Sequence, residues 1–222
     1  MRLTYFGHSA FLIEGNGVTA LIDPFFPSVK PDLNGNGLNY IFVTHGHADH
    51  LGETVDLALK YDAVVICNPE LGHYLSKKGV QIHPMQIGGS FDFTFGKVKM
   101  VNATHSSSIT ENGEIIYAGP PCGFLIHSEG NKIYHAGDTG LMMDMKLLED
   151  ESIDVALLPI GGNYTMDVDD AIKAVKMIRP SLVIPMHYDT FPLIRADVDK
   201  FAEEARKFCN VKILNCKETI VL

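Results

Sequence analysis

The sequence is poor in positive charge and has no long apolar run. Only 18 of its 222 residues are Lys or Arg, against 27 Asp or Glu, and the formal net charge is −9. Binding to a nucleic-acid backbone depends on clustered cations, so this balance argues against a nucleic-acid surface. No run approaches the ~18 apolar residues that a membrane span needs. We therefore expect neither nucleic acid nor a membrane as a partner.

The sequence also lacks a cysteine pair with metal or redox spacing. Its four cysteines form no CxxC motif, and Cys67, in the apolar run 64–67, is typical of a buried thiol. The first 14 residues contain one Arg, a short apolar stretch at 10–13 and then Glu14, which does not fit a secretory signal peptide. A reducing, cytoplasmic location is the expectation that follows.

The length and the hydrophobic content favour a folded domain. With 46% hydrophobic residues, the chain can bury a substantial core, and we expect one domain over residues 1–222. Two Gly-containing polar segments are expected to be loops: 24–39, with Asn34-Gly35-Asn36-Gly37, and 106–121. The second is long for a connection, so it is a candidate lid or substrate loop, and an ordinary surface excursion is equally open.

Apolar patterning predicts two similar halves. Short alternating or fully apolar runs indicate strands at 3–6, 10–13, 18–22, 40–43, 63–67, 91–95, 98–103, 123–127, 132–136, 155–160, 182–186, 211–214 and 219–222. Helical spacing is expected around 55–59 and at 69–78, 168–178 and 198–208. Each half reads as meandering strands followed by strand, helix, strand. This order predicts an α/β fold, a four-layer αββα sandwich of two mixed sheets packed face to face with helices outside.

The most informative motif is the run Thr44-His45-Gly46-His47-Ala48-Asp49-His50, which directly follows a predicted strand. Imidazoles at positions i and i+2 of a bend, here His45 and His47, can converge on one cation. Asp49 and His50 point to a second cation nearby. The loop alone supplies too few donors, so the remaining ligands have to come from other strand ends, where a rigid scaffold holds them.

Three further donors stand at such strand ends: His105, Asp138 and His187. Four other histidines have no partner donor at ligand spacing and are expected at the surface or in the core: His73, His83, His127 and His135. The acidic residues Asp167, Asp169 and Asp170 precede a predicted helix. We expect them to cap that helix rather than to bind a metal.

Taken in order, THGHADH, His105 after a strand, GDTG around Asp138 and His187 after LVIPM resemble the signature of the metallo-β-lactamase superfamily. GHSAFLIE near the start, THSSS and GDTG are similar to a branch of small metal-dependent hydrolases related to L-ascorbate-6-phosphate lactonase. This resemblance implies the αββα fold and a binuclear metal site. Its first metal would be bound by His45, His47 and His105, its second by Asp49, His50 and His187, with Asp138 bridging the two.

The resemblance implies two divalent ions, most often zinc, with manganese or iron in some relatives; His and carboxylate donors do not settle the choice. Antibiotic-degrading lactamases have Cys in the place of Asp138 and are exported, so we do not expect a β-lactamase. Two ions about 3.5 to 4 Å apart would lower the pKa of a bridging water toward ~7. The resulting hydroxide would attack an ester, lactone or phosphoester bond of a small molecule, while Asp49 orients it and collects its proton.

Several neighbouring residues keep two interpretations. His8 in GHS is either an acid or substrate contact or a hydrogen-bonded structural His. Tyr164 and Tyr188 could donate to an oxyanion, although packing beside the site is favoured. The serines at 106–108 could contact a polar substrate or simply form a loop.

Two other functions share such a metal core. A nuclease or RNA-processing phosphodiesterase is the main alternative, and it predicts a basic groove or an added domain that the sequence does not indicate. A diiron redox module is the third reading, but it is usually fused to a flavin domain and carries Glu in place of His47. A small-molecule hydrolase is therefore the first expectation, with substrate identity and a homo-oligomeric state left open.

Overall fold

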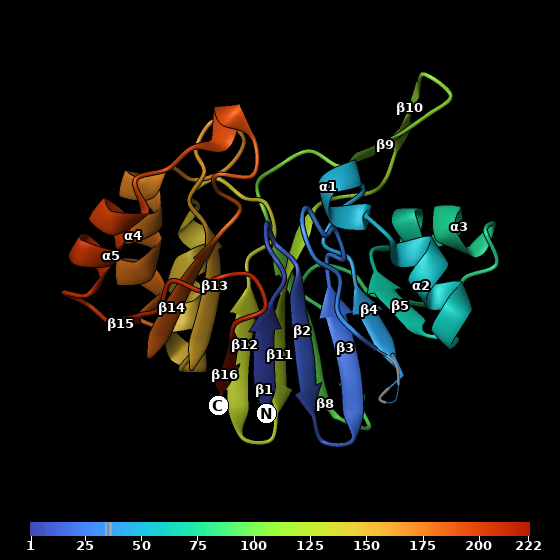
Figure 1. The fold of residues 1–222 in the computed structure, drawn as a ribbon, viewed down its shortest axis with the longest axis horizontal. Helices are drawn as coiled ribbons and strands as arrows, with labels where there is room; N and C mark the ends of the chain where they lie inside the picture. The colour runs from blue at the N-terminus through green and yellow to red at the C-terminus, as the bar shows by residue number, and fades with distance from the viewer. Residues whose placement is uncertain (34, 36) are drawn as a thin grey trace.

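Two seven-stranded mixed sheets form the centre of the computed structural model, which describes residues 1–33, 35 and 37–222 (Figure 1). In the first sheet the strands, in spatial order, are β16 (Thr219–Val221), β1 (Arg2–Tyr5), β2 (Phe11–Gly15), β3 (Val18–Ile22), β4 (Tyr40–Phe42), β5 (Val64–Cys67) and β6 (Ile82–Pro84). In the second they are β15 (Asn210–Val211), β14 (Leu182–Met186), β13 (Val155–Pro159), β12 (Asn131–His135), β11 (Cys122–Ser128), β8 (Gly96–Asn102) and β7 (Ser90–Phe93).

Both sheets change from antiparallel to parallel pairing at the same point in their order. The first is antiparallel from β16 to β3 and parallel from β3 to β6. The second is antiparallel from β7 to β12 and parallel from β12 to β15. Parallel neighbours need crossover connections, which are usually helical. This repeated order confirms the internal similarity of the two halves.

The helices lie outside the two sheets (Figure 1). On the first sheet these are α2 (Thr54–Tyr61) and α3 (Pro69–Ser76), and on the second α4 (Val168–Ile178) and α5 (Val198–Ala205). Asp167 caps α4, because its side chain accepts a hydrogen bond from the backbone N–H of Asp170 at 2.8 Å. The predicted capping role is confirmed, and the four-layer αββα sandwich is the fold observed.

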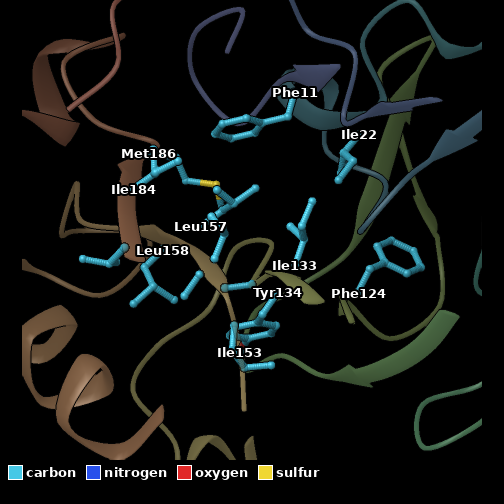
Figure 2. Close-up of a cluster of buried hydrophobic side chains, with 14 of the residues drawn as sticks. Phe11, Ile22, Phe124, Ile133, Tyr134, Ile153, Leu157, Leu158, Ile184 and Met186 are labelled. Carbon is cyan, nitrogen blue, oxygen red and sulfur yellow. The ribbon is translucent and has the colours of Figure 1, made fainter. Parts of the chain in front are cut away.

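The inner faces of the sheets meet in an apolar core (Figure 2). Phe11 of β2 lies there with Phe124 and Ile133 of the second sheet, all fully buried. The rings of Phe42 and Phe124 meet edge to face with their centroids 5.2 Å apart, an arrangement that aromatic pairs prefer. Contacts across this layer fix the position of one sheet against the other.

The segment 106–121 is not the loop that the sequence predicts. It contains a hairpin of β9 (Ser108–Glu111) and β10 (Glu114–Tyr117), which projects from the body of the molecule as a separate two-stranded sheet (Figure 1). The turn residues Asn112 and Gly113 both have positive φ, at 53° and 83°. Asn-Gly is a strong signal for such a turn, and the polar residues around it obscured the strands.

Other differences are local. The sequence did not predict strand β6 or three short helices: α1 (Ala48–Leu51), η1 (Met143–Glu151) and η2 (Pro192–Ile194). The strand expected at 211–214 is reduced to β15, and Asn34 and Asn36 of the loop predicted at 24–39 lie outside the described residues. Among the residues that are described, no helix is long and apolar enough to span a membrane.

We expect Phe124→Ala to lower the free energy of unfolding by about 3–5 kcal/mol, because it leaves a cavity where the two sheets meet. Phe208→Ala is the control, since that side chain is 47% exposed, and its cost is expected to stay below about 1 kcal/mol. Urea unfolding of both variants measures the difference. Equal costs for the two would contradict this account of the core.

Candidate metal centre

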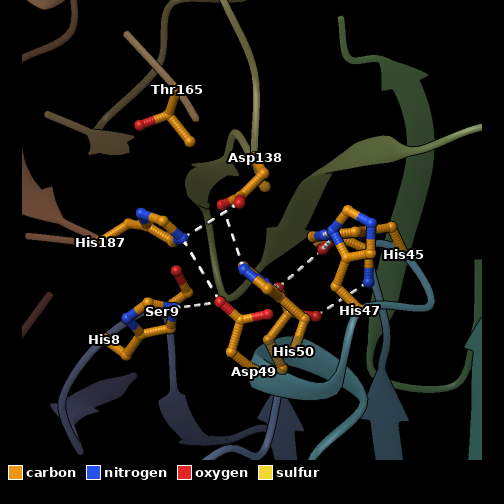
Figure 3. Close-up of polar contacts among 12 residues, drawn as sticks. His8, Ser9, His45, His47, Asp49, His50, Asp138, Thr165 and His187 are labelled. Carbon is orange, nitrogen blue, oxygen red and sulfur yellow. Dashed lines mark hydrogen bonds and ion pairs between the residues drawn. The ribbon is translucent and has the colours of Figure 1, made fainter. Parts of the chain in front are cut away.

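The seven predicted ligands lie together at one edge of the two sheets. Figure 3 labels all of them except His105. His45 follows β4 and leads into α1, of which His47 is the N-cap and Asp49 and His50 are members. The others follow strands of the second sheet: His105 after β8, Asp138 after β12 and His187 after β14. These strands all end at the same edge, which is why residues far apart in sequence meet there.

The donor atoms form three overlapping groups, each with its members within 4.8 Å of one another: His45, His47 and His105; His8, Asp49, His50 and His187; and His45, His50 and Asp138. The first group is the set that the resemblance gives to the first metal. The second contains the set given to the second metal and adds His8. Asp138 has donors of both sets around it.

The distances within the centre are short. His45 Nε2 lies 3.0 Å from His47 Nδ1, and the ring of His105 is centred 5.1 Å from each of these two rings. Asp138 Oδ1 lies 3.1 Å from His50 Nε2, and Asp138 Oδ2 lies 3.0 Å from His187 Nε2 and 3.6 Å from His105 Nε2. Asp138 is therefore the carboxylate at the middle of the imidazoles.

The positions of these atoms suit coordination of a cation better than hydrogen bonds among themselves. His50 Nε2, His187 Nε2 and Asp138 Oδ1 are buried and have no partner with hydrogen-bond geometry among the described residues. Polar atoms are rarely left so, because an unsatisfied buried group costs about 1–3 kcal/mol. In a tetrahedral site with bonds of about 2.0–2.2 Å, neighbouring ligand atoms lie about 3.3–3.6 Å apart. The spacing and the donor types both suit divalent cations.

The electrostatics point the same way. Burial lowers the pKa of His45 well below its usual value, and burial likewise lowers the pKa of His47 and of His105. Neutral imidazole is the form that binds a metal. Burial alone would lower the pKa of His50, but the charges of Asp138 and Asp23 outweigh it and raise that pKa well above normal. A divalent cation here would take the place of the proton.

One important residue was missed by the sequence analysis. Asp23, directly after β3, is fully buried and has a positive φ of 44°. Its Oδ1 accepts from the backbone N–H of Thr44 at 2.8 Å, and its Oδ2 accepts from the Thr44 hydroxyl and from His50 Nδ1, both at 2.7 Å. The sequence did offer one signal for it: Asp23 is an acidic residue that directly follows an apolar strand, as the predicted ligands do.

Asp23 fixes the orientation of two imidazoles. The Thr44 hydroxyl has one proton and donates it to Asp23, so it accepts at Oγ1 from His45 Nδ1, 3.0 Å away. His45 and His50 therefore both use Nδ1 for a hydrogen bond to this network and turn Nε2 toward the other donors. Such partners behind a ligand set its tautomer and ring orientation.

His8 contacts Asp49 directly. Its Nε2 lies 3.1 Å from Asp49 Oδ2 and its Nδ1 3.0 Å from Thr190 Oγ1, while its ring is centred 4.1 Å from that of His187. Burial lowers the pKa of His8 to about 4, against the raising effect of Asp49. Burial would raise the pKa of Asp49, but the hydrogen bond from His8 and the charge of His50 bring it below its usual range.

A cavity of about 270 Å³ opens onto the centre and is lined by His47, Asp49, His105, Ser106, Asp138, Tyr164 and His187. Of the two candidate tyrosines, Tyr164 lines it, whereas Tyr188 packs against the apolar core. The candidate serines also differ in position, since Ser106 lines the cavity and Ser107 does not. Ser107 is buried, accepts from the Gly46 N–H and donates to the Ala118 carbonyl, so it holds the histidine loop in place.

The remaining histidines lie elsewhere. His135 is buried in β12, where Nε2 donates to the Ser9 carbonyl and Nδ1 accepts from the Gly137 N–H. His73 is exposed on α3, and His83 lies against the rings of Phe91 and Phe93. None of these, nor His127, belongs to the donor groups found in the described part of the chain.

Comparison with known proteins agrees with the fold and the site. A family model described as a beta-lactamase superfamily domain matches residues 2–187. A "UPF0173 metal-dependent hydrolase" of Alkaliphilus metalliredigens is 50% identical over 98% of both chains, and one of Carboxydothermus hydrogenoformans is 47% identical over the full length of both. A solved structure described as a novel metallo hydrolase, from Ignicoccus hospitalis, is 36% identical, covers 99% of this chain and 97% of its own, and has a TM-score of 0.88.

The relation to L-ascorbate-6-phosphate lactonase stays a prediction. The broader assignment rests on near full-length similarity and on a fold with two mixed seven-stranded sheets. The chain belongs to the metallo-β-lactamase superfamily and is a metal-dependent hydrolase.

Proposed function

We propose that this hydrolase holds two divalent cations and cleaves an ester, lactone or phosphoester bond in a small molecule. The observation that carries the proposal is the convergence of buried imidazole and carboxylate atoms that have no hydrogen-bond partner of their own among the described residues. His45, His47 and His105 would hold the first cation, Asp49, His50 and His187 the second, and Asp138 both. Zinc is proposed first, and manganese or iron suits the same donors.

Bound at this position, the cations would supply acidity, lowering the pKa of a water toward ~7 and polarising the substrate oxygen. The carboxylate of Asp49 lines the cavity, and its low pKa keeps it ionised. It can orient an attacking water by accepting its hydrogen bond and then take up its proton. His8 holds Oδ2 of Asp49 in place and is itself held by Thr190.

A small substrate is supported by the size and lining of the cavity. Its volume of about 270 Å³ lies just below the roughly 300–1,000 Å³ of most ligand pockets. No Lys or Arg of the described residues lines it, whereas a nucleic-acid groove would rely on such side chains. Ser106 and Tyr164 at the rim can donate hydrogen bonds to a polar or phosphorylated group.

A metabolite turnover screen tests the proposal. We expect protein loaded with zinc or with manganese to hydrolyse at least one ester, lactone or phosphoester, and the Asp138→Ala protein to be inactive, because it lacks the carboxylate shared by both sites. Elemental analysis should give two cations per chain. Stoichiometric binding of a single cation, or activity that survives in Asp138→Ala, would contradict the two-cation assignment.

Asp49→Asn should lower kcat about 10²- to 10⁴-fold on the substrate so identified, because the amide cannot accept a proton. Asp56→Asn is the matched control, since Asp56 is exposed on α2, and it should keep full activity. An Asp49→Asn protein that retains both its cations and its turnover would disprove the proton role.

Asp23→Asn should weaken cation binding by about 10- to 100-fold, because an amide in this place no longer accepts from both His50 and Thr44. Competition with a chromogenic chelator measures the affinity, and circular dichroism establishes that the variant is folded. Asp56→Asn again serves as the control. Unchanged affinity in folded Asp23→Asn would show that the network does not position the ligands.

A further inference from the structure

The outer face of the second sheet carries a chamber of about 180 Å³ between β8, β12 and η1. Its walls are mainly apolar and include Met145, Leu148 and the ring of Tyr134. Tyr134 is fully buried, and its hydroxyl has no hydrogen-bond partner among the described residues. In Figure 2 it lies beside Ile153, while its neighbour Ile133 points toward Ile22 of the first sheet.

That unpartnered hydroxyl is unusual. A buried Tyr O–H normally donates to a neighbouring acceptor, and each exception in a native structure asks for an explanation. Burial, with a contribution from the charge of Asp144, raises the pKa of Tyr134. The hydroxyl therefore keeps its proton and can donate it to an acceptor that enters the chamber.

A second cavity, of about 300 Å³, adjoins the chamber. The two share Gly88, Lys99 and Glu151 in their walls, so they lie against each other. Only the chamber is lined by Tyr134, and only the second cavity by Lys97 and His127. The chamber thus offers mainly apolar walls with the unpartnered Tyr134 hydroxyl, and the second cavity offers basic side chains.

The basic end is built into the strand register. Lys97 of β8 is paired with His127 of β11, which is paired with Lys132 of β12, so the three side chains lie side by side on one face. Lys99, two residues from Lys97, points to the same face and pairs with Glu151 at 3.1 Å. In a chain with net charge −9, this is a local concentration of positive charge.

The acids nearby offset part of it, since Glu151 pairs with Lys99 and Asp144 lies in the wall of the chamber. Glu151 is the one carboxylate in the wall of the second cavity within the described chain, and Asp92 lies opposite Lys97 in the register. Burial lowers the pKa of His127, and Lys132 lowers it further, while Glu151 acts in the opposite direction. His127 Nε2 is buried and unpartnered in the described structure.

We propose that these two adjoining cavities together bind a small organic anion with an apolar body, which passes the Lys99–Glu151 ion pair in their shared wall. The anionic group lies in the second cavity against Lys97 and His127, and the body fills the chamber. An oxygen acceptor at the far end of the body receives the hydrogen bond of Tyr134. A cavity of about 150 Å³ holds a benzene-sized group, so the chamber has room for a short alkyl or aryl chain.

Isothermal titration of the intact protein with three probes tests the proposal: octanoate, octanoate with a ketone near its far end, and the matching neutral methyl ketone. We expect the keto acid to bind most tightly and the neutral ketone at least tenfold more weakly. Lys97→Ser should weaken both acids by roughly tenfold. Tyr134→Phe should weaken the keto acid by roughly three- to tenfold and leave octanoate unchanged, because only the keto acid accepts from the hydroxyl.

Two controls separate this site from the metal centre and from general charge effects. Asp138→Ala should leave the binding of all three probes unchanged. If the carboxylate probes bound at the metal centre instead, their affinity would fall in this variant. Lys77→Ser, a change of an exposed lysine on the other sheet's side, should also have no effect. No binding of the keto acid at millimolar concentration, binding lost in Asp138→Ala, or equal affinities in wild type, Lys97→Ser and Tyr134→Phe would each overturn the proposal.

Discussion

The structure depends on keeping several imidazoles and carboxylates close together out of water. Burying unpaired ionisable groups is costly unless they coordinate a metal or one another. The chain accepts a further local cost at the same place, because His8, Asp23 and His187 all have positive φ although none is glycine. All three stand directly after strands or within three residues of one. Part of the backbone strain of the described chain thus lies where these side chains turn toward a shared point.

Neither half of the fold can form this centre alone. The first sheet supplies the motif at 45–50 and Asp23, and the second supplies His105, Asp138 and His187. The edge at which they meet is set by the core beneath it, where Phe42 packs on Phe124. Cation binding should therefore stabilise the packing of one sheet on the other, since ligands from both are drawn to common positions.

A feature could be predicted from the sequence where its signal lies in neighbouring residues, and not where it depends on contacts between distant ones. The motif at 45–50 is contiguous, and each distant ligand follows a run of apolar residues, so strand patterning placed each donor at a strand end. The family resemblance then grouped these donors into one site. Asp23 gave no such signal, because its importance arises only from contacts with Thr44 and His50 across neighbouring strands. The hairpin at 108–117 was missed for another reason: its turn is a strong signal, but each of its strands has only four residues, and β9 holds a single apolar one.

The alternation of side chains along one strand places three different environments within a few residues of each other. In β12, Ile133 and His135 face the first sheet, and Tyr134 between them faces outward under η1. The strand then ends, and Asp138 follows at the metal centre. The six consecutive residues 133–138 therefore contribute side chains to the core, to the outer chamber and to the metal centre. A ligand held by Tyr134 would rest on the strand that positions the carboxylate shared by both proposed cation sites.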